Sequence, residues 1–207
     1  MSESEPNERT DGVALQGNGR SKRRRAGTLN SPHSRLPAPL ATVPATTVSL
    51  GVDPGLNRTG YAILERGRRG PILREAGVIR STPKMTLAER VLEIGQGLRE
   101  VCAQYRPEVM AIEQVFSTGE FPKTALLMAH ARGAILYAAA DAGVKVVHYT
   151  PRQIKKLLTG SGKAGKEQVQ RAIANELRLD RLLEPFDVSD AAAVALCHYY
   201  SSRVPIS

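Results

Sequence analysis

Apolar residues recur along residues 46–207 in runs and periods that predict alternating strands and helices. Short apolar runs bounded by Gly, Pro or Asn are typical of strands. Apolar residues spaced three or four positions apart are typical of helices. Strands are expected over 48–52, 61–64, 72–79, 109–112 and 144–149, and helices over 86–105, 124–142, 151 to a break at 160–162, 166–179 and 188–202.

The order of these elements predicts the class of fold. The first three strands follow one another with turn residues between them, so they are expected to form an antiparallel meander. Each of the next two strands follows a helix, as in parallel strand–helix units. The chain is therefore predicted to be an α/β protein with a central five-stranded mixed sheet, three strands antiparallel and then two parallel, flanked by helices.

Residues 1–45 have a different character from the rest of the chain. They lack apolar periodicity and are rich in Ser, Pro, Gly, Asn and Thr. Such a segment cannot bury enough apolar surface to offset its ordering entropy. We expect a disordered basic N-terminal extension, followed by one folded domain over 46–207. The basic run at 22–25 could add nonspecific phosphate affinity, but a solvated tail without a specific role explains it as well.

The net charge of the protein is +9, and it is shared between both parts. Residues 1–45 contain seven Lys and Arg against four Asp and Glu, and 46–207 contain 22 against 16. A basic surface favours a polyanionic partner such as nucleic acid or an anionic membrane, without deciding between them. No apolar run approaches the ~20 residues that cross a bilayer, and no secretory signal is recognisable. Cys102 and Cys197 fit buried free thiols, so a cytoplasmic protein is expected.

Four acidic residues stand at positions that suggest a shared site. Asp53 and Glu113 end two apolar strands, and sites in open sheets form beyond such strand ends. Asp187 and Asp190 are three residues apart where the last helix begins, so they share a face. Helix capping is the competing explanation, with Asp187 or Ser189 as the N-cap and Asp190 in the first turn.

The residues after Asp190 bear on that alternative. The sequence AAAVAL over 191–196 is small and apolar, which predicts that the helix packs closely on the sheet. Its first turn then approaches Asp53 and Glu113. Four carboxylates without a Cys or His ligand favour Mg²⁺ or Mn²⁺. Two such ions would suit hydrolysis of a phosphodiester.

Ordered motifs over about residues 46–202 resemble those of a known family. They are LGVDPG at 50–55, TGY at 59–61, AIEQVF at 111–116, ARG at 131–133, PRQIK at 151–155, GKAGKEQV at 162–169 and DVSDA at 187–191. In this order they are similar to RuvC, the family of bacterial Holliday-junction resolvases (crossover junction endodeoxyribonucleases) in the RNase H-like superfamily.

The resemblance implies a structure-selective, two-metal endonuclease of recombination and DNA repair. A homodimer would make paired symmetric nicks in four-way junctions, and a branch-migration complex of the RuvA/RuvB type would be its partner. The catalytic metal ligands implied are Asp53, Glu113, Asp187 and Asp190; some relatives have His in place of Asp187. The helix over 124–142 resembles the dimer-forming element, although a simply buried helix would look the same.

The resemblance also implies residues that contact DNA. They are Phe116, Arg132, Lys155, Lys163 and Lys166. Phe116 would stack on bases at the junction centre, or it could be a core residue. Lys155 and Lys166 would act near the scissile phosphate, or they could be solvated helical lysines. Residues 117–122 depart from the family's usual loop, and the N-terminal extension has no counterpart in the family core.

Two other functions compete with a nuclease. Sugar-kinase and actin-like ATPases also begin with a strand, an Asp and a hairpin, but they need a second subdomain that this chain is too short to supply. A non-catalytic junction-binding protein could share the fold, and a missing acid would be its simplest sign. All four acids are present, which favours the enzyme.

Overall fold

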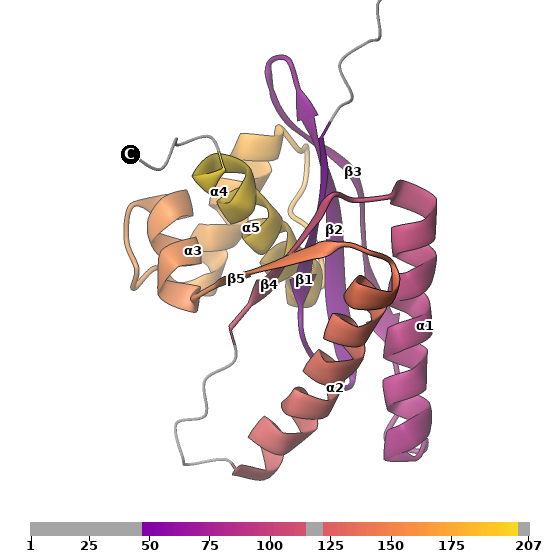
Figure 1. Cartoon of the computed structure of the whole chain (residues 1–207). Coiled ribbons are helices and arrows are strands. Elements are labelled where there is room, and N and C mark those ends of the chain that lie inside the picture. Colours follow the sequence, from indigo (N-terminus) through magenta and orange to yellow (C-terminus); the bar gives the residue numbers. More distant parts are fainter. Residues whose placement is uncertain (1–46, 115–121, 203–207) are drawn as a thin grey trace, which may run out of the picture. The chain divides into compact units, whose positions relative to one another are not determined.

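The computed structural model describes residues 47–114 and 122–202, which form a five-stranded sheet with helices on both faces (Figure 1). The strands are β1 (Val48–Asp53), β2 (Arg58–Gly67), β3 (Gly70–Arg80), β4 (Val109–Glu113) and β5 (Lys145–Tyr149). The helices are α1 (Leu87–Tyr105), α2 (Pro122–Asp141), α3 (Pro151–Thr159), α4 (Lys166–Leu177) and α5 (Phe186–Ser201). Their order is the one predicted from the sequence.

The strand order is β3-β2-β1-β4-β5, with β1 in the middle and β4 beside it. β2 pairs antiparallel with both β1 and β3, whereas β4 pairs parallel with both β1 and β5. The predicted mixed sheet is thereby confirmed. Val52 of β1 pairs with Ile112 of β4, so Asp53 and Glu113 are the next residues along two neighbouring strands.

Two apolar cores lie on the two faces of the sheet. On one face α1 and α2 pack with residues such as Ile94, Leu98 and Ile135. On the other face α3, α4 and α5 pack with residues such as Ile154 and Ile173. Cys102 and Cys197, one in each core, are free and buried as expected. None of the helices described is both long and apolar enough to cross a bilayer.

Local sequence sets the beginnings of α1 and α3. Thr86 and Glu89 form a capping box at the start of α1, and Thr150 and Gln153 form another at the start of α3. In each, the Thr side chain accepts from the third backbone N–H of the helix while the Glu or Gln side chain accepts from the Thr backbone N–H. These exchanges satisfy amides that a helix would otherwise leave without partners.

The last helix begins earlier than the sequence pattern predicts. α5 starts at Phe186 with Pro185 as its N-cap, and no side chain caps it. The proposed capping roles of Asp187 and Ser189 are therefore wrong. Pro185 has a φ of −67°, which already suits entry into a helix. Asp187 lies in the first turn, and the Ser189 hydroxyl donates to the Phe186 carbonyl over 3.0 Å.

Two glycines allow α5 to lie directly against the sheet. A Cβ atom on Gly51 of β1 would stand 2.2 Å from the Ala191 carbonyl oxygen, and one on Gly60 of β2 would stand 1.9 Å from the Asp187 carbonyl oxygen. Side chains cannot approach a backbone so closely, so only glycine fits either position. This close contact explains why buried alanines follow Asp190 in the sequence.

The other differences from the predicted elements concern their ends. β2 extends well beyond the predicted 61–64 and β3 slightly beyond the predicted 72–79, because backbone pairing continues to the tight turn between Gly67 and Gly70. The predicted N-terminal extension over 1–45 lies outside the described residues. The division into an extension and one folded domain over 46–207 stays a prediction.

Candidate active site

Asp53 lies at the end of β1 in a largely buried position among other acids. Burial raises the pKa of Asp53 to about 8, and the negative charges of Asp190, Glu113 and Asp187 add to the effect. Lys166 acts in the opposite direction on this pKa. A carboxyl group that is buried beside like charges is a common mark of a functional site.

Glu113 and Asp190 have the same kind of environment. Burial is the main cause that raises the pKa of both carboxyl groups, while the positive charges of Lys155 and Lys166 lower it. Asp190 also raises the pKa of Glu113. The structure thus brings together one acid from β1, one from β4 and one from α5, with two lysines from α3 and α4 beside them.

Asp187 takes a different position from the other three acids. Its carboxylate forms an ion pair with Arg58, with 3.3 Å between Nε and Oδ2. Its charge still contributes to the raised pKa of both Asp53 and Asp190. Arg58 was missed in the sequence, because its contact with Asp187 depends on the packing of α5 against β2. The pair ties the first turn of α5 to the start of β2.

The predicted DNA-contacting residues are only partly brought to this site. Lys166 extends over the ring of Phe186, with 5.5 Å from its nitrogen to the ring centroid. Lys163 is exposed and is not among the charges that shift the pKa of any of the acids. Arg132 points its guanidinium at the Glu113 backbone. Phe116 lies outside the described residues.

The oxygen-only donor set suits a hard divalent cation. Asp53, Glu113, Asp187 and Asp190 offer carboxylate oxygens, the ligands that Mg²⁺ and Mn²⁺ prefer. Within the described residues, no three His, Cys, Asp or Glu side chains stand together as a ready-made metal cage. The acids fit a divalent cation by their chemistry, and burial together with neighbouring negative charges raises the pKa of Asp53, Glu113 and Asp190.

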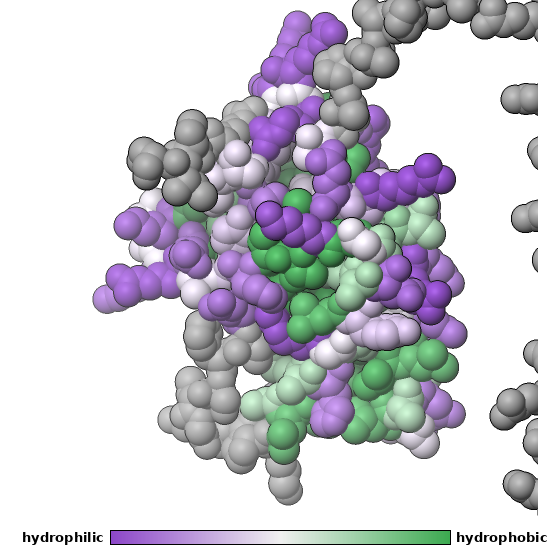
Figure 2. Space-filling model, viewed as in Figure 1, coloured by the Kyte–Doolittle hydropathy of each residue, from purple (hydrophilic) through white to green (hydrophobic). Residues whose placement is uncertain are grey.

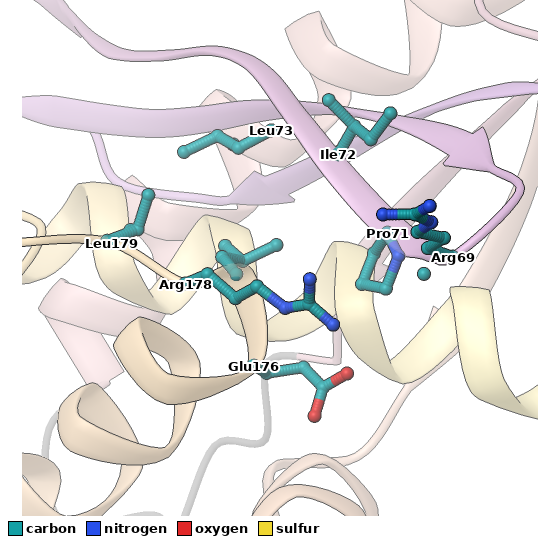
Figure 3. A pocket seen from close by; sticks show the side chains of 9 residues that line it. Arg69, Pro71, Ile72, Leu73, Glu176, Arg178 and Leu179 are labelled. Carbon is teal, nitrogen blue, oxygen red and sulfur yellow. The ribbon is translucent and has the colours of Figure 1, made fainter.

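A separate hollow of about 300 Å³ lies at the opposite end of the sheet (Figure 3). It is formed by the β2–β3 turn and the end of α4, and Arg178 extends toward Arg69 and Pro71 above Glu176. Because β1 runs from Val48 to Asp53 and Glu65 of β2 pairs with Val48, this turn lies away from the acids. The hollow is therefore not part of the acidic site.

Sheet order and acid positions together define a class of protein. The sheet has the order β3-β2-β1-β4-β5, acids end the neighbouring strands β1 and β4, and a third acid lies on the last helix. This arrangement is that of nucleases with the RNase H-like fold. The family model for the crossover junction endodeoxyribonuclease RuvC matches residues 49–198. The chain belongs to the RuvC family.

Relatives and solved structures agree with that assignment. A crossover junction endodeoxyribonuclease RuvC of Rhodopirellula baltica is 52% identical over 157 residues, covering 76% of this chain and 88% of the relative. The Thermus thermophilus RuvC structure is similar with a TM-score of 0.70 and 34% identity, covering 76% of this chain and 96% of that one. RuvC of the same organism in complex with a Holliday junction has a TM-score of 0.69 and 32% identity, covering 76% and 95%.

Proposed function

We propose that this protein resolves four-way DNA junctions by metal-dependent hydrolysis of phosphodiester bonds, in recombination and repair. The observation that supports this most is the environment of Asp53, a partly buried carboxyl group with a pKa of about 8 beside Glu113, Asp187 and Asp190. A divalent cation favours the charged form of such a group. The solved relative in complex with a Holliday junction suggests the substrate.

The residues divide into acids that would hold metal and lysines that would face DNA. We assign Asp53, Glu113 and Asp190 as ligands of Mg²⁺ or Mn²⁺, with Asp187 as a further ligand held by Arg58. When bound, two ions would activate water and stabilise the leaving oxygen. The charges of Lys155 and Lys166 act on Glu113 and Asp190, which supports a role for these lysines in contacting the negative phosphate.

The direct test of this function is cleavage of a synthetic four-way junction. The full-length protein is incubated with the junction in Mg²⁺, in Mn²⁺ or in EDTA, beside a linear duplex of matched sequence. We expect paired nicks in the junction with either metal and none in EDTA or in the duplex. Binding without cleavage in both metals would instead support a non-catalytic junction-binding protein. Membership of the RuvC family leaves the ATPase alternative without support.

A homodimer is the expected assembly, and an exposed apolar surface on α1 and α2 is suited to it. Figure 2 shows hydrophobic side chains gathered over these helices. Leu92 of α1 is 57% exposed, and Tyr137 of α2 is 64% exposed. Both line a hollow of about 320 Å³ between the two helices. Apolar surface of this kind marks interaction sites.

We expect Leu92→Glu to shift the protein from dimer to monomer. A charge buried in an apolar interface without a partner costs several kcal/mol, so the dimer dissociation constant should rise by about 100-fold or more. Sedimentation equilibrium over a range of concentrations measures this change. Leu182→Glu, at a comparably exposed leucine outside α1 and α2, is the matched control. Equal dissociation constants in wild type and Leu92→Glu would place the dimer interface elsewhere.

We expect Phe116→Ala to reduce junction cutting about tenfold. Stacking of an aromatic ring on a base contributes about 1–3 kcal/mol, and the substitution removes the ring. Single-turnover cleavage of the junction measures the effect, and affinity for linear duplex, which has no unpaired central bases, should stay the same. A parallel loss of duplex affinity would argue against stacking at the junction centre.

We also propose a cellular setting and a partner for the protein. The two free, buried cysteines suit a reducing cytoplasm. A branch-migration complex of the RuvA/RuvB type is the partner that we propose for the dimer on its junction.

A further inference from the structure

Arg132 connects the strand that ends in Glu113 to the neighbouring strand. Its Nη1 donates to the Glu113 carbonyl oxygen over 2.7 Å, and its Nη2 lies 2.8 Å from Nδ1 of His148 on β5. A guanidinium has only donors, so Nδ1 of His148 accepts and the ring proton is on Nε2. Two nitrogens of one planar group therefore fix two different strands from α2.

The Glu113 carbonyl lies at the end of β4, where the sheet still pairs Glu113 with Tyr149 of β5 but no longer pairs this strand with β1. The pairing of β1 with β4 ends at Val52 and Ile112, one residue earlier. The next amide, that of Gln114, donates to the Tyr149 carbonyl over 2.8 Å. Arg132 and Tyr149 thus hold two successive backbone groups at the end of β4.

This orientation does not suit a residue whose main task is to bind phosphate. The Arg132 side chain is only partly exposed, and two of its nitrogens already have acceptors within the protein. A DNA phosphate could use only the three N–H groups that remain on the guanidinium. Lys155 and Lys166, by contrast, have positive charges that act directly on Glu113 and Asp190. They are therefore better candidates for phosphate binding than Arg132.

We propose that Arg132 is a positioning residue that sets the place of the Glu113 carboxylate by fixing the backbone of Glu113. This inference rests on the proposed function of Glu113 as a metal ligand. A carboxylate side chain starts from its own Cα, so movement of the strand end moves the carboxylate with it. Misplacement of a reacting group by about 1 Å can lower a rate about 100-fold, and loss of partners that orient ligands lowers metal affinity about 10–100-fold.

Arg132→Lys separates this role from phosphate binding. Lysine keeps the positive charge, but its single ammonium group cannot reproduce the planar pair of bonds to Glu113 and His148. We expect Arg132→Lys to bind Mn²⁺ about tenfold more weakly or worse in calorimetry without DNA, and to lower single-turnover cleavage by a similar or larger factor. Junction affinity in Ca²⁺ and its dependence on salt should stay as in wild type. Arg181→Lys, at an exposed arginine in the α4–α5 connection, is the control.

Hydrogen–deuterium exchange gives a readout that needs neither metal nor DNA. In Arg132→Lys the amide of Gln114 should exchange faster, while the amides in the middle of β4 and the melting temperature change little. His148→Phe, which removes only the second acceptor, should show the same pattern to a smaller degree.

Three outcomes would overturn the inference. Wild-type Mn²⁺ affinity in Arg132→Lys would show that the bonds to β4 do not position Glu113. A preserved rate in Arg132→Lys, with weaker junction binding and a shallower salt dependence in Arg132→Gln, would show a phosphate contact instead. Uniformly faster exchange with a lower melting temperature would show a general structural role. Failure of wild type itself to cut junctions would count against the proposed function, whereas Mn²⁺ affinity and exchange would still test Arg132.

Discussion

Asp53→Asn should reduce junction cleavage by about 1000-fold or more while junction affinity stays within about threefold of wild type. Asparagine has the same shape but lacks the negative charge that a divalent cation requires. Metal ions supply several kcal/mol of transition-state stabilisation, and about 4 kcal/mol corresponds to about 1000-fold in rate. Single-turnover cleavage in Mg²⁺ and junction affinity in Ca²⁺ measure the two quantities separately.

Asp180→Asn is the matched control, because Asp180 is an exposed acid away from the site. It should leave both rate and affinity unchanged. Cleavage by Asp53→Asn at the wild-type rate would remove the acidic site from the mechanism. Equal loss of binding and cleavage would mean that the substitution disturbs the fold rather than metal binding.

The same substitution should stabilise the protein in the absence of metal. The pKa of Asp53 is about 8 in the folded state against 3.8 ordinarily, so the folded state binds the proton more tightly. The free energy of unfolding therefore decreases as the pH rises from about 4 to about 8, and the loss persists above pH 8. Asparagine stays neutral at every pH.

Asp53→Asn should consequently melt several degrees above wild type at pH 8.5 in EDTA, and the difference should shrink toward pH 5. Differential scanning calorimetry across this range measures it. Saturating Mg²⁺ should reverse the order, since only wild type gains stability from the cation. The apparent affinity of wild type for metal should also increase up to about pH 8, because the cation displaces the proton of Asp53.

Gly60→Ala should damage both stability and activity. The new methyl group would stand 1.9 Å from the Asp187 carbonyl oxygen and 2.6 Å from its carbon. Both atoms are backbone, so α5 itself must move. Overpacking of this kind costs about 1–3 kcal/mol or more in the free energy of unfolding. A shift of Asp190 by about 1 Å should lower cleavage about 100-fold.

Gly95→Ala provides the control for this substitution. Gly95 lies within α1, and a Cβ atom there would meet nothing within 4 Å beyond the helix's own nearby backbone. Alanine favours a helix over glycine by about 0.5–1 kcal/mol, so this variant should be slightly more stable than wild type. Urea unfolding compares the two variants, whereas cleavage by Gly60→Ala is compared with wild type, because Gly95 lines the hollow of the proposed dimer surface. Wild-type behaviour of Gly60→Ala in both assays would contradict the close packing of α5 on β2.

The sequence was sufficient to predict the positions of those site residues that depend on strand order. Asp53 and Glu113 follow apolar runs, and two neighbouring parallel strands place their ends side by side. The beginning of α5 was less predictable, because Pro185 starts the helix before the apolar pattern does. The ion pair of Asp187 with Arg58 depends on contact between α5 and β2, and no spacing along the chain reports such a contact.

Arg132 shows a second limit of prediction from sequence. The resemblance of the ARG sequence at 131–133 to the RuvC motif implied that Arg132 contacts DNA, and arginine does bind phosphate well. The structure instead directs its guanidinium at a backbone carbonyl and a histidine. Which acceptor an arginine finds depends on the angle between helix and sheet, and this angle is set by packing in the core.

The glycine contacts of α5 give the acidic site two halves, Asp190 on α5 and Glu113 on β4. The two differ in how far substitutions can change the position of the acid. The position of Asp190 is set by contact of the α5 backbone with the strand backbone at Gly51 and Gly60. Substitutions at these glycines therefore cannot adjust the position of Asp190 without displacing the helix. Glu113 is placed by a replaceable side chain, that of Arg132. Efforts to change the metal preference of this nuclease should therefore vary Arg132 and His148 and keep the α5 half constant.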